Sequence, residues 1–113
     1  MVAERTIDER PGVFEALADP TRRWMIQRLA RGESLTPTAL AEELPITRQA
    51  VSRHLTVLQQ GGLVSARKEG REHRYQLTAA PLGTVTDWIA EIERVWDARL
   101  AALGDLLSDE PGS

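Results

Sequence analysis

A run of polar side chains between residues 47 and 56 is of the kind that forms hydrogen bonds with nucleic acid. Arginine can bind guanine through two parallel hydrogen bonds, glutamine can do the same with adenine, and hydroxyl groups reach phosphates or base edges. Residues near the start of a helix that enters the major groove usually reach the bases. We therefore expect Arg48 and Gln49 to contact bases, and Arg53 to contact a base or a phosphate. The full candidate set is Thr47, Arg48, Gln49, Ser52, Arg53, His54 and Thr56.

A second group of cations surrounds Glu69-Gly70, which lies between two stretches with strand character, residues 63–68 and 71–77. This arrangement predicts a tight β-hairpin with charged residues at its tip. Basic side chains on a protruding hairpin suit contacts with the DNA backbone or the minor groove, which add affinity rather than sequence choice. A hairpin whose charges are merely solvated is the alternative interpretation. The cations are Arg67, Lys68, Arg71 and Arg74.

The sequence offers little that could support catalysis or bind a metal. It has no cysteine, no Gly-rich phosphate loop and no Gly-x-Ser-x-Gly. Glu42 and Glu43 are adjacent, but neighbours on a helix point about 100° apart and do not face each other. His54 and His73 stand on different elements without acids at ligand spacing. We predict no enzyme, no metal and no cofactor; packing or a hydrogen bond is the alternative role for His54.

Proline and glycine mark the elements that must position these side chains. Asp19-Pro20 and Thr36-Pro37 predict helix starts, and Thr47 caps a third helix. The expected helices cover 14–18, 20–31, 37–44 and 47–60, the last two being joined by two or three residues around Pro45-Ile46. A hairpin and a long helix over 81–107 follow. The predicted class is mainly α with a small β-hairpin wing, a winged helix-turn-helix in the order ααααββα.

The last helix carries an apolar stripe that exceeds what a small domain needs for its own core. The stripe consists of Leu82, Val85, Ile89, Ile92, Trp96, Leu103 and Leu106, at spacings typical of one helix face. We expect it to dimerise with a second copy, together with Phe14 and Leu17 from the first helix. Trp88 and Trp96 could instead line a pocket for an apolar effector, whereas Trp24 is expected in the core.

Charge is segregated along the 113 residues, although the net charge is only −3. Residues 19–75 contain ten Arg/Lys and six Asp/Glu, whereas both ends are acidic. A basic middle favours encounter with a polyanion, because the local field matters more than the total charge. No apolar run approaches the roughly 20 residues of a membrane span, and no signal sequence opens the chain. We expect a cytoplasmic protein with one domain, residues 11–107, between flexible ends at 1–10 and 108–113.

Several segments together resemble the ArsR family of winged-helix repressors over residues 13–107. They are Ala16-Leu17-Ala18-Asp19-Pro20-Thr21-Arg22-Arg23, Ala50-Val51-Ser52-Arg53-His54-Leu55, Leu58 with Gly61-Gly62-Leu63-Val64, and Glu69-Gly70-Arg71 with Tyr75. The resemblance implies a bacterial or archaeal homodimer that binds operator DNA and often represses its own operon. Metal-sensing members carry a cysteine pair on the first helix of the motif, or Asp, His and Glu ligands on the last helix. This chain has Ala39-Leu40-Ala41-Glu42-Glu43 at the first place and no histidine in the last helix, and so resembles the cysteine-free branch.

These observations lead to one main functional hypothesis and one rival. The first is a sequence-specific transcriptional regulator, an autoregulating repressor that binds an inverted-repeat operator in double-stranded DNA as a homodimer. An unidentified small-molecule effector is a further candidate partner. The rival is a winged-helix module that binds a protein instead of DNA. The basic hairpin and the basic helix over 47–60 favour DNA.

Overall fold

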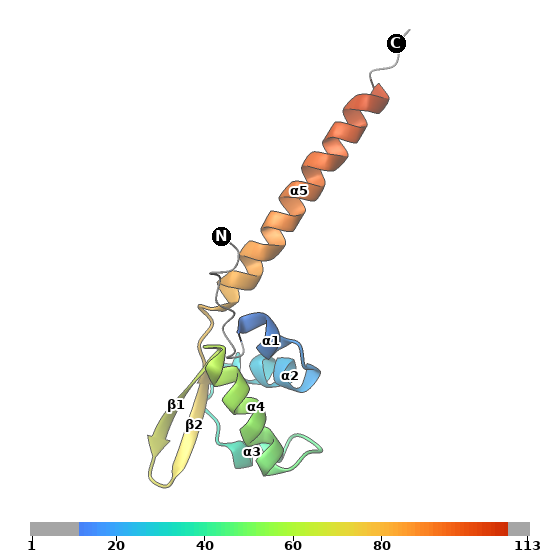
Figure 1. Ribbon diagram of the computed structural model, residues 1–113. Helices are drawn as coiled ribbons and strands as arrows, with labels where there is room; N and C mark the ends of the chain where they lie inside the picture. Colours follow the sequence, from blue (N-terminus) through green and yellow to red (C-terminus); the bar gives the residue numbers. More distant parts are fainter. Residues whose placement is uncertain (1–11, 109–113) are drawn as a thin grey trace, which may run out of the picture. The chain divides into compact units, whose positions relative to one another are not determined.

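The computed structural model describes residues 12–108 and contains five helices and one hairpin in that range (Figure 1). This order confirms the predicted ααααββα class. The expected flexible ends fall outside the described residues, except that Ser108 ends the last helix. The chain divides after Leu82 into two compact units. The elements are α1 Val13–Leu17, α2 Pro20–Leu29, α3 Pro37–Ala41, α4 Arg48–Gln60, β1 Val64–Glu69, β2 Glu72–Leu77 and α5 Leu82–Ser108.

Three helices begin at the caps that the sequence predicts. The Asp19 carboxylate accepts a hydrogen bond from the Arg22 backbone N–H at 3.0 Å. The hydroxyls of Thr36 and Thr47 accept from the amides three residues further on, at 3.1 and 3.0 Å. Such a cap satisfies one of the amides that the first turn leaves without a partner. The starts of α2, α3 and α4 are therefore determined locally.

Two helices end earlier than the sequence predicts, since α2 ends at Leu29 instead of residue 31. Helix α3 stops at Ala41, not at residue 44, and six residues instead of two or three separate it from α4. Its last turn tightens into i→i−3 bonds, from Glu43 N–H to Leu40 O and from Leu44 N–H to Ala41 O. Pro45 disfavours helical backbone at Leu44, the residue before it, which explains why the helix does not reach residue 44.

The turn of the hairpin lies one residue later than predicted. Glu69 pairs with Glu72, so the turn consists of Gly70 and Arg71 rather than Glu69 and Gly70. Gly70 has φ of +64°, a left-handed conformation that glycine adopts without steric cost. At the base of the hairpin, Leu35 and Tyr75 exchange two backbone hydrogen bonds of 2.9 and 2.8 Å. The hairpin is thus anchored to the segment before α3.

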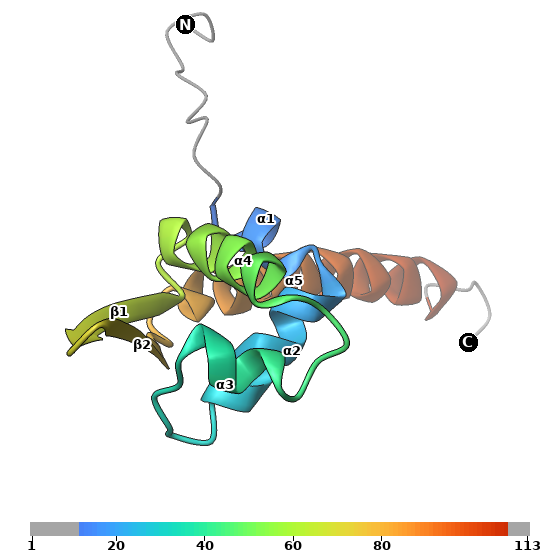
Figure 2. The same cartoon turned by 90° about the horizontal axis from the view of Figure 1, so that it is seen from below.

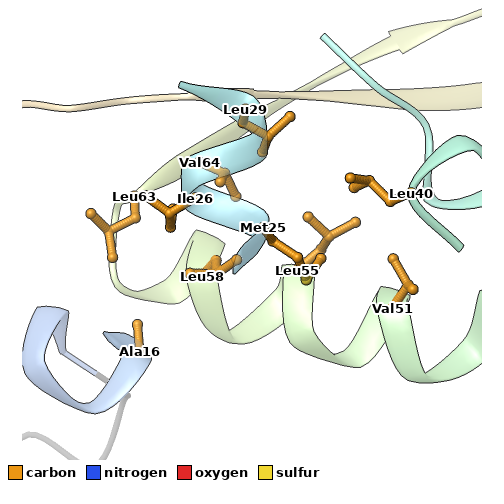
Figure 3. Close-up of a cluster of buried hydrophobic side chains, with 10 residues drawn as sticks. All are labelled: Ala16, Met25, Ile26, Leu29, Leu40, Val51, Leu55, Leu58, Leu63 and Val64. Atoms are coloured by element: carbon orange, nitrogen blue, oxygen red, sulfur yellow. The ribbon is translucent and has the colours of Figure 1, made fainter. Parts of the chain in front are cut away.

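The core of the first unit lies where α2, α4 and the start of β1 meet (Figure 3). Trp24 is half-buried against this core, in line with its expected place. Burying each large side chain contributes about 1.5–3 kcal/mol, so these contacts outweigh local preferences. The buried set is Ala16, Met25, Ile26, Leu29, Leu40, Val51, Leu55, Leu58, Leu63 and Val64.

Helix α5 runs for 27 residues and keeps its apolar side chains on the surface. Its large apolar residues from Trp88 to Leu107 are between 45% and 73% exposed. Within residues 12–108, no helix is both long and apolar enough to cross a membrane. An exposed apolar face of this length marks a surface for association.

The cap of α2 generates a test of local stability. Asp19→Ala should lower the free energy of unfolding by about 1 kcal/mol near neutral pH. The hydrogen bond from the Arg22 amide holds the pKa of Asp19 below its usual range, because it favours the charged carboxylate. The contribution is therefore complete above the pKa of the unfolded chain, and is lost as pH falls through the lower pKa of the folded one.

Urea denaturation of both proteins at neutral and acidic pH measures this difference, at one fixed protein concentration. Asp105→Ala is the matched control, because Asp105 is an exposed aspartate of α5. Surface changes of that kind usually stay within about 0.5 kcal/mol. Equal stability of the two variants at neutral pH would contradict the capping role of Asp19.

Candidate nucleic-acid interface

Helix α4 buries one side and presents a polar side to solvent. Val51, Leu55 and Leu58 are fully buried. The opposite side carries Gln49, Arg53 and Thr56, all exposed, and Thr47 and Arg48 are exposed at its N-terminal end. Ser52 is half-buried on one flank, and its carbonyl accepts a 3.0 Å hydrogen bond from the Thr56 hydroxyl. The structure therefore brings six of the seven candidates of this helix onto one surface.

His54 points to the other flank of α4, toward α2. Its Nδ1 lies 3.3 Å from a terminal guanidinium nitrogen of Arg22 and 3.9 Å from the Asp19 carboxylate. A guanidinium group can only donate, so Nδ1 is the acceptor in this hydrogen bond. This geometry matches the packing and hydrogen-bonding role rather than the DNA contact.

The same arginine holds α1 in place. Arg22 Nε donates to Ala16 O at 2.7 Å, and its second terminal nitrogen donates to Glu15 O at 3.1 Å. Arg23 adds a 2.8 Å bond to Leu17 O. These bonds satisfy carbonyls at the end of a helix of only five residues, which could not be stable alone. Arg22 thereby joins α1, α2 and α4 through one side chain.

The four cations of the hairpin differ in their surroundings. Arg67 and Arg74 both donate to the Glu69 carboxylate, at 3.3 and 3.2 Å. Arg74 also donates to Ser34 O at 3.0 Å, which ties the hairpin to the segment before α3. Lys68 and Arg71 are exposed and form no ion pair within the described part of the chain. These two are the cations of the hairpin that have no carboxylate partner among the described residues.

A cleft of about 130 Å³ separates the hairpin from the two helices of the motif. The tip of the hairpin and the N-terminal end of α4 lie at the same end of this unit, and both views show the hairpin beside the α3–α4 pair (Figures 1 and 2). The lining residues are Thr36, Pro37, Thr38, Arg48, Ser52, Arg71, Glu72, His73 and Tyr75. Thr38 and His73 are not among the residues that the sequence predicts to contact DNA, and the structure alone places them in this lining.

The acids next to α3 have a structural partner. Glu43 accepts from Arg28 Nε at 2.9 Å, and Glu33 accepts from another nitrogen of Arg28 at 2.6 Å. The hydrogen bond from Arg28 lowers the pKa of Glu43, and the two acids raise that of Arg28. Residues 12–108 contain no group of three or more His, Cys, Asp or Glu side chains that could hold a metal ion. Glu43 is thus engaged in an ion pair that connects α2 to the α3–α4 loop.

The residues expected at a dimer interface fall into two groups. Ile89, Ile92, Trp96, Leu103 and Leu106 are exposed along α5, Val85 is half-buried, and Phe14 of α1 is 46% exposed. Leu17 and Leu82 instead pack partly against the core of the first unit. A groove of about 420 Å³ runs along α5. It is lined by Trp96, Arg99, Leu100, Ala102, Leu103 and Leu106.

Comparison with known proteins agrees with this geometry. Residues 17–66 match the family model of a helix-turn-helix domain. The chain is 38% identical over 97 residues to the HTH-type transcriptional regulator Rv2034 of Mycobacterium tuberculosis, covering 86% of this chain and 87% of that protein. Family and fold are those of transcriptional regulators and not of enzymes.

Two solved structures extend the comparison to the whole fold. An ArsR-like transcriptional regulator from Rhodococcus sp. RHA1 superimposes with a TM-score of 0.77 and 39% identity, over 87% of this chain and 89% of that one. The homodimeric winged helix-turn-helix DNA-binding domain of Mb0332 from Mycobacterium bovis superimposes with a TM-score of 0.55 and 31% identity, over 78% of each chain. Because sequence and fold agree over most of the chain, this protein belongs to the ArsR-like family of winged helix-turn-helix transcriptional regulators.

Proposed function

We propose that this protein is a repressor that binds an inverted-repeat operator as a homodimer. The observation that carries this proposal is the polar side of α4. It stands beside a hairpin whose tip carries Lys68 and Arg71, two cations without an ion pair among the described residues. A helix enters the major groove with such a side toward the bases, and the hairpin then meets the adjacent backbone. Gln49 is the base-contacting candidate with the fewest competing roles, since it is exposed and lies in the first turn of α4.

Dimerisation through α5 is the second part of the proposal. Leaving the apolar stripe in water costs more than a small monomer can offset, since each large side chain gains about 1.5–3 kcal/mol on burial. The homodimeric relative from Mycobacterium bovis supports a second copy of this chain as the occupant. Two copies would place their α4 helices about 34 Å apart, in successive major grooves, which accounts for an inverted repeat.

Regulation of its own operon follows from the same proposal. A dimer seated on an operator upstream of its gene would block transcription, and the cytoplasm of a bacterium or archaeon is where it would meet that DNA. The alternative role of α5 is to bind a small-molecule effector in its groove. The groove volume of about 420 Å³ falls within the usual range of small-molecule sites, of about 300–1,000 Å³. However, its lining residues include those that the proposed dimer would cover.

Base contacts and backbone contacts should separate on mutation. Gln49→Ala should reduce the preference for operator over scrambled DNA by about 1–3 kcal/mol, because a base-specific pair is lost. Lys68→Gln should weaken binding to both duplexes similarly, and lower the slope of log K against log salt by about one. Gel shifts at several salt concentrations, on an operator found in the protein's own upstream region, measure both effects.

Gln59→Ala is the matched control, because Gln59 is an exposed glutamine near the other end of α4. It should leave both affinity and preference unchanged. If Lys68→Gln lost the preference for operator over scrambled DNA and Gln49→Ala kept it, the hairpin would contact the bases and the helix the backbone. A wild-type protein that binds no upstream duplex would favour the protein-interaction module instead.

The apolar face of α5 can be tested without touching the DNA-binding surface. Ile92→Glu, or Trp96→Glu, should give monomeric or unfolded protein and abolish operator binding, because a buried charge at the interface has no partner. Light scattering and gel shifts on the same samples report both properties. Ala90→Glu places the same charge on the polar face of α5, and should leave dimer and affinity intact. A dimeric Ile92→Glu protein with normal binding would move the interface elsewhere.

Metal ions should not regulate this protein. Low micromolar zinc, cadmium or arsenite should leave the operator affinity unchanged, because no cysteine is present and the His54 ring is engaged with Arg22. Fluorescence anisotropy of labelled operator, with EDTA-treated protein as the reference, measures the effect. Stoichiometric metal binding accompanied by a large loss of operator affinity would contradict the assignment to the branch that does not sense metals.

A further inference from the structure

We propose that the cleft between the hairpin and α4 holds one phosphodiester of the DNA backbone, bound jointly by Arg48 and Arg71. This inference rests on the DNA-binding function proposed above and assigns one backbone phosphate of the DNA to this cleft. It also changes the role of Arg48, which the sequence places among the base contacts. In the structure Arg48 lines the cleft together with residues of the hairpin.

The size of the cleft selects a small ligand. Its volume of about 130 Å³ lies well below the range of about 300–1,000 Å³ that is usual for metabolite and drug sites. Besides the two arginines, the hydroxyls of Thr38 and Ser52 line it, and both can donate to an oxyanion. On the hairpin side His73 lines the cleft together with Glu72 and Tyr75. These donors suit a tetrahedral oxyanion better than an apolar effector.

The charges in the cleft favour a ligand with a single negative charge. Arg48 and Arg71 come from different elements, and neither forms an ion pair within residues 12–108. Guanidinium groups bind phosphate oxygens through parallel hydrogen bonds and carry five donors each. Glu72 places one carboxylate in the same lining. Two cations and one anion match the single charge of a backbone phosphodiester, whereas a free phosphate monoester carries about −1.5 to −2 near neutral pH.

A phosphate shared in this way would set the position of the hairpin relative to α4. The Arg71 side chain reaches the cleft from the hairpin turn and Arg48 reaches it from the first turn of the helix. One anion bound by both would fix the depth at which α4 lies in the groove and, with it, the register of Gln49 on the bases. Arg48 then contributes to affinity on every DNA sequence and not to sequence choice.

The experiment uses the full-length protein and single uncharged phosphates. An operator is first selected from random duplexes with the wild-type protein. Duplexes with one methylphosphonate at each successive position of a half-site are then titrated with wild type, Arg48→Gln, Arg71→Gln and Lys68→Gln. Both arginines are exposed and form no ion pair with any residue in the range 12–108, so their replacement should not disturb folding, which circular dichroism checks.

One position in each half-site should cost the wild-type protein about tenfold in affinity, as expected for hydrogen bonds to a charged group. Arg48→Gln and Arg71→Gln should both lose most of that sensitivity, at the same position. Lys68→Gln should keep it, because Lys68 does not line the cleft. Arg48→Gln should also weaken operator and scrambled DNA to the same extent.

Three results would overturn the proposal. The two arginine variants could lose sensitivity at different phosphates, or Arg48→Gln could lose operator preference while keeping the sensitivity. Alternatively, no methylphosphonate position could change the affinity, while titration with inorganic phosphate alone shifts the NMR signals of the arginine Nε–H groups in a saturable way. That result would assign the cleft to a free phosphate. Failure of the wild-type protein to enrich any duplex would refute the DNA-binding function itself, an outcome distinct from the other three.

Discussion

The DNA-facing surface depends on the burial of one apolar stripe on α4. Val51, Leu55 and Leu58 are inaccessible to solvent, and the stripe packs against α2, where Met25 is equally buried. Rotating α4 by even one residue would expose leucine and bury Gln49 or Arg53 without a partner. Each of those changes costs on the order of a kilocalorie per mole or more. The orientation of the polar side is therefore a consequence of the core.

Arg22 adds a polar constraint that the core cannot supply. Its guanidinium group reaches two carbonyls of α1 and the ring of His54, so three helices meet at one side chain. A helix of five residues has little stability of its own, and the carbonyls at its end need donors. The position of α1 relative to α4 thus depends on these hydrogen bonds as well as on the burial of Ala16 in the core. His54 is better understood as part of this link than as a DNA ligand.

The two units of the chain differ in where their apolar residues lie. The first buries its apolar residues internally and presents polar groups at one end. Helix α5 does the reverse, since its apolar residues stay exposed along 27 residues. In the proposed dimer a second copy covers that face, so that folding and association become coupled. The acidic residues on the other face of α5 then remain in water.

Local chemistry by itself determined the helix starts at Asp19, Thr36 and Thr47, the hairpin, the long last helix and the apolar stripes. Caps, prolines and periodicity act within a few residues, so they can be recognised without the fold. Tertiary structure alone decided that His54 faces Arg22, 32 residues away, and that Arg74 reaches Ser34, 40 residues away. It also decided that Arg48 and Arg71 line one cleft. Periodicity defines which side of a helix is apolar, but the partner of a polar side chain depends on which distant segment packs beside it.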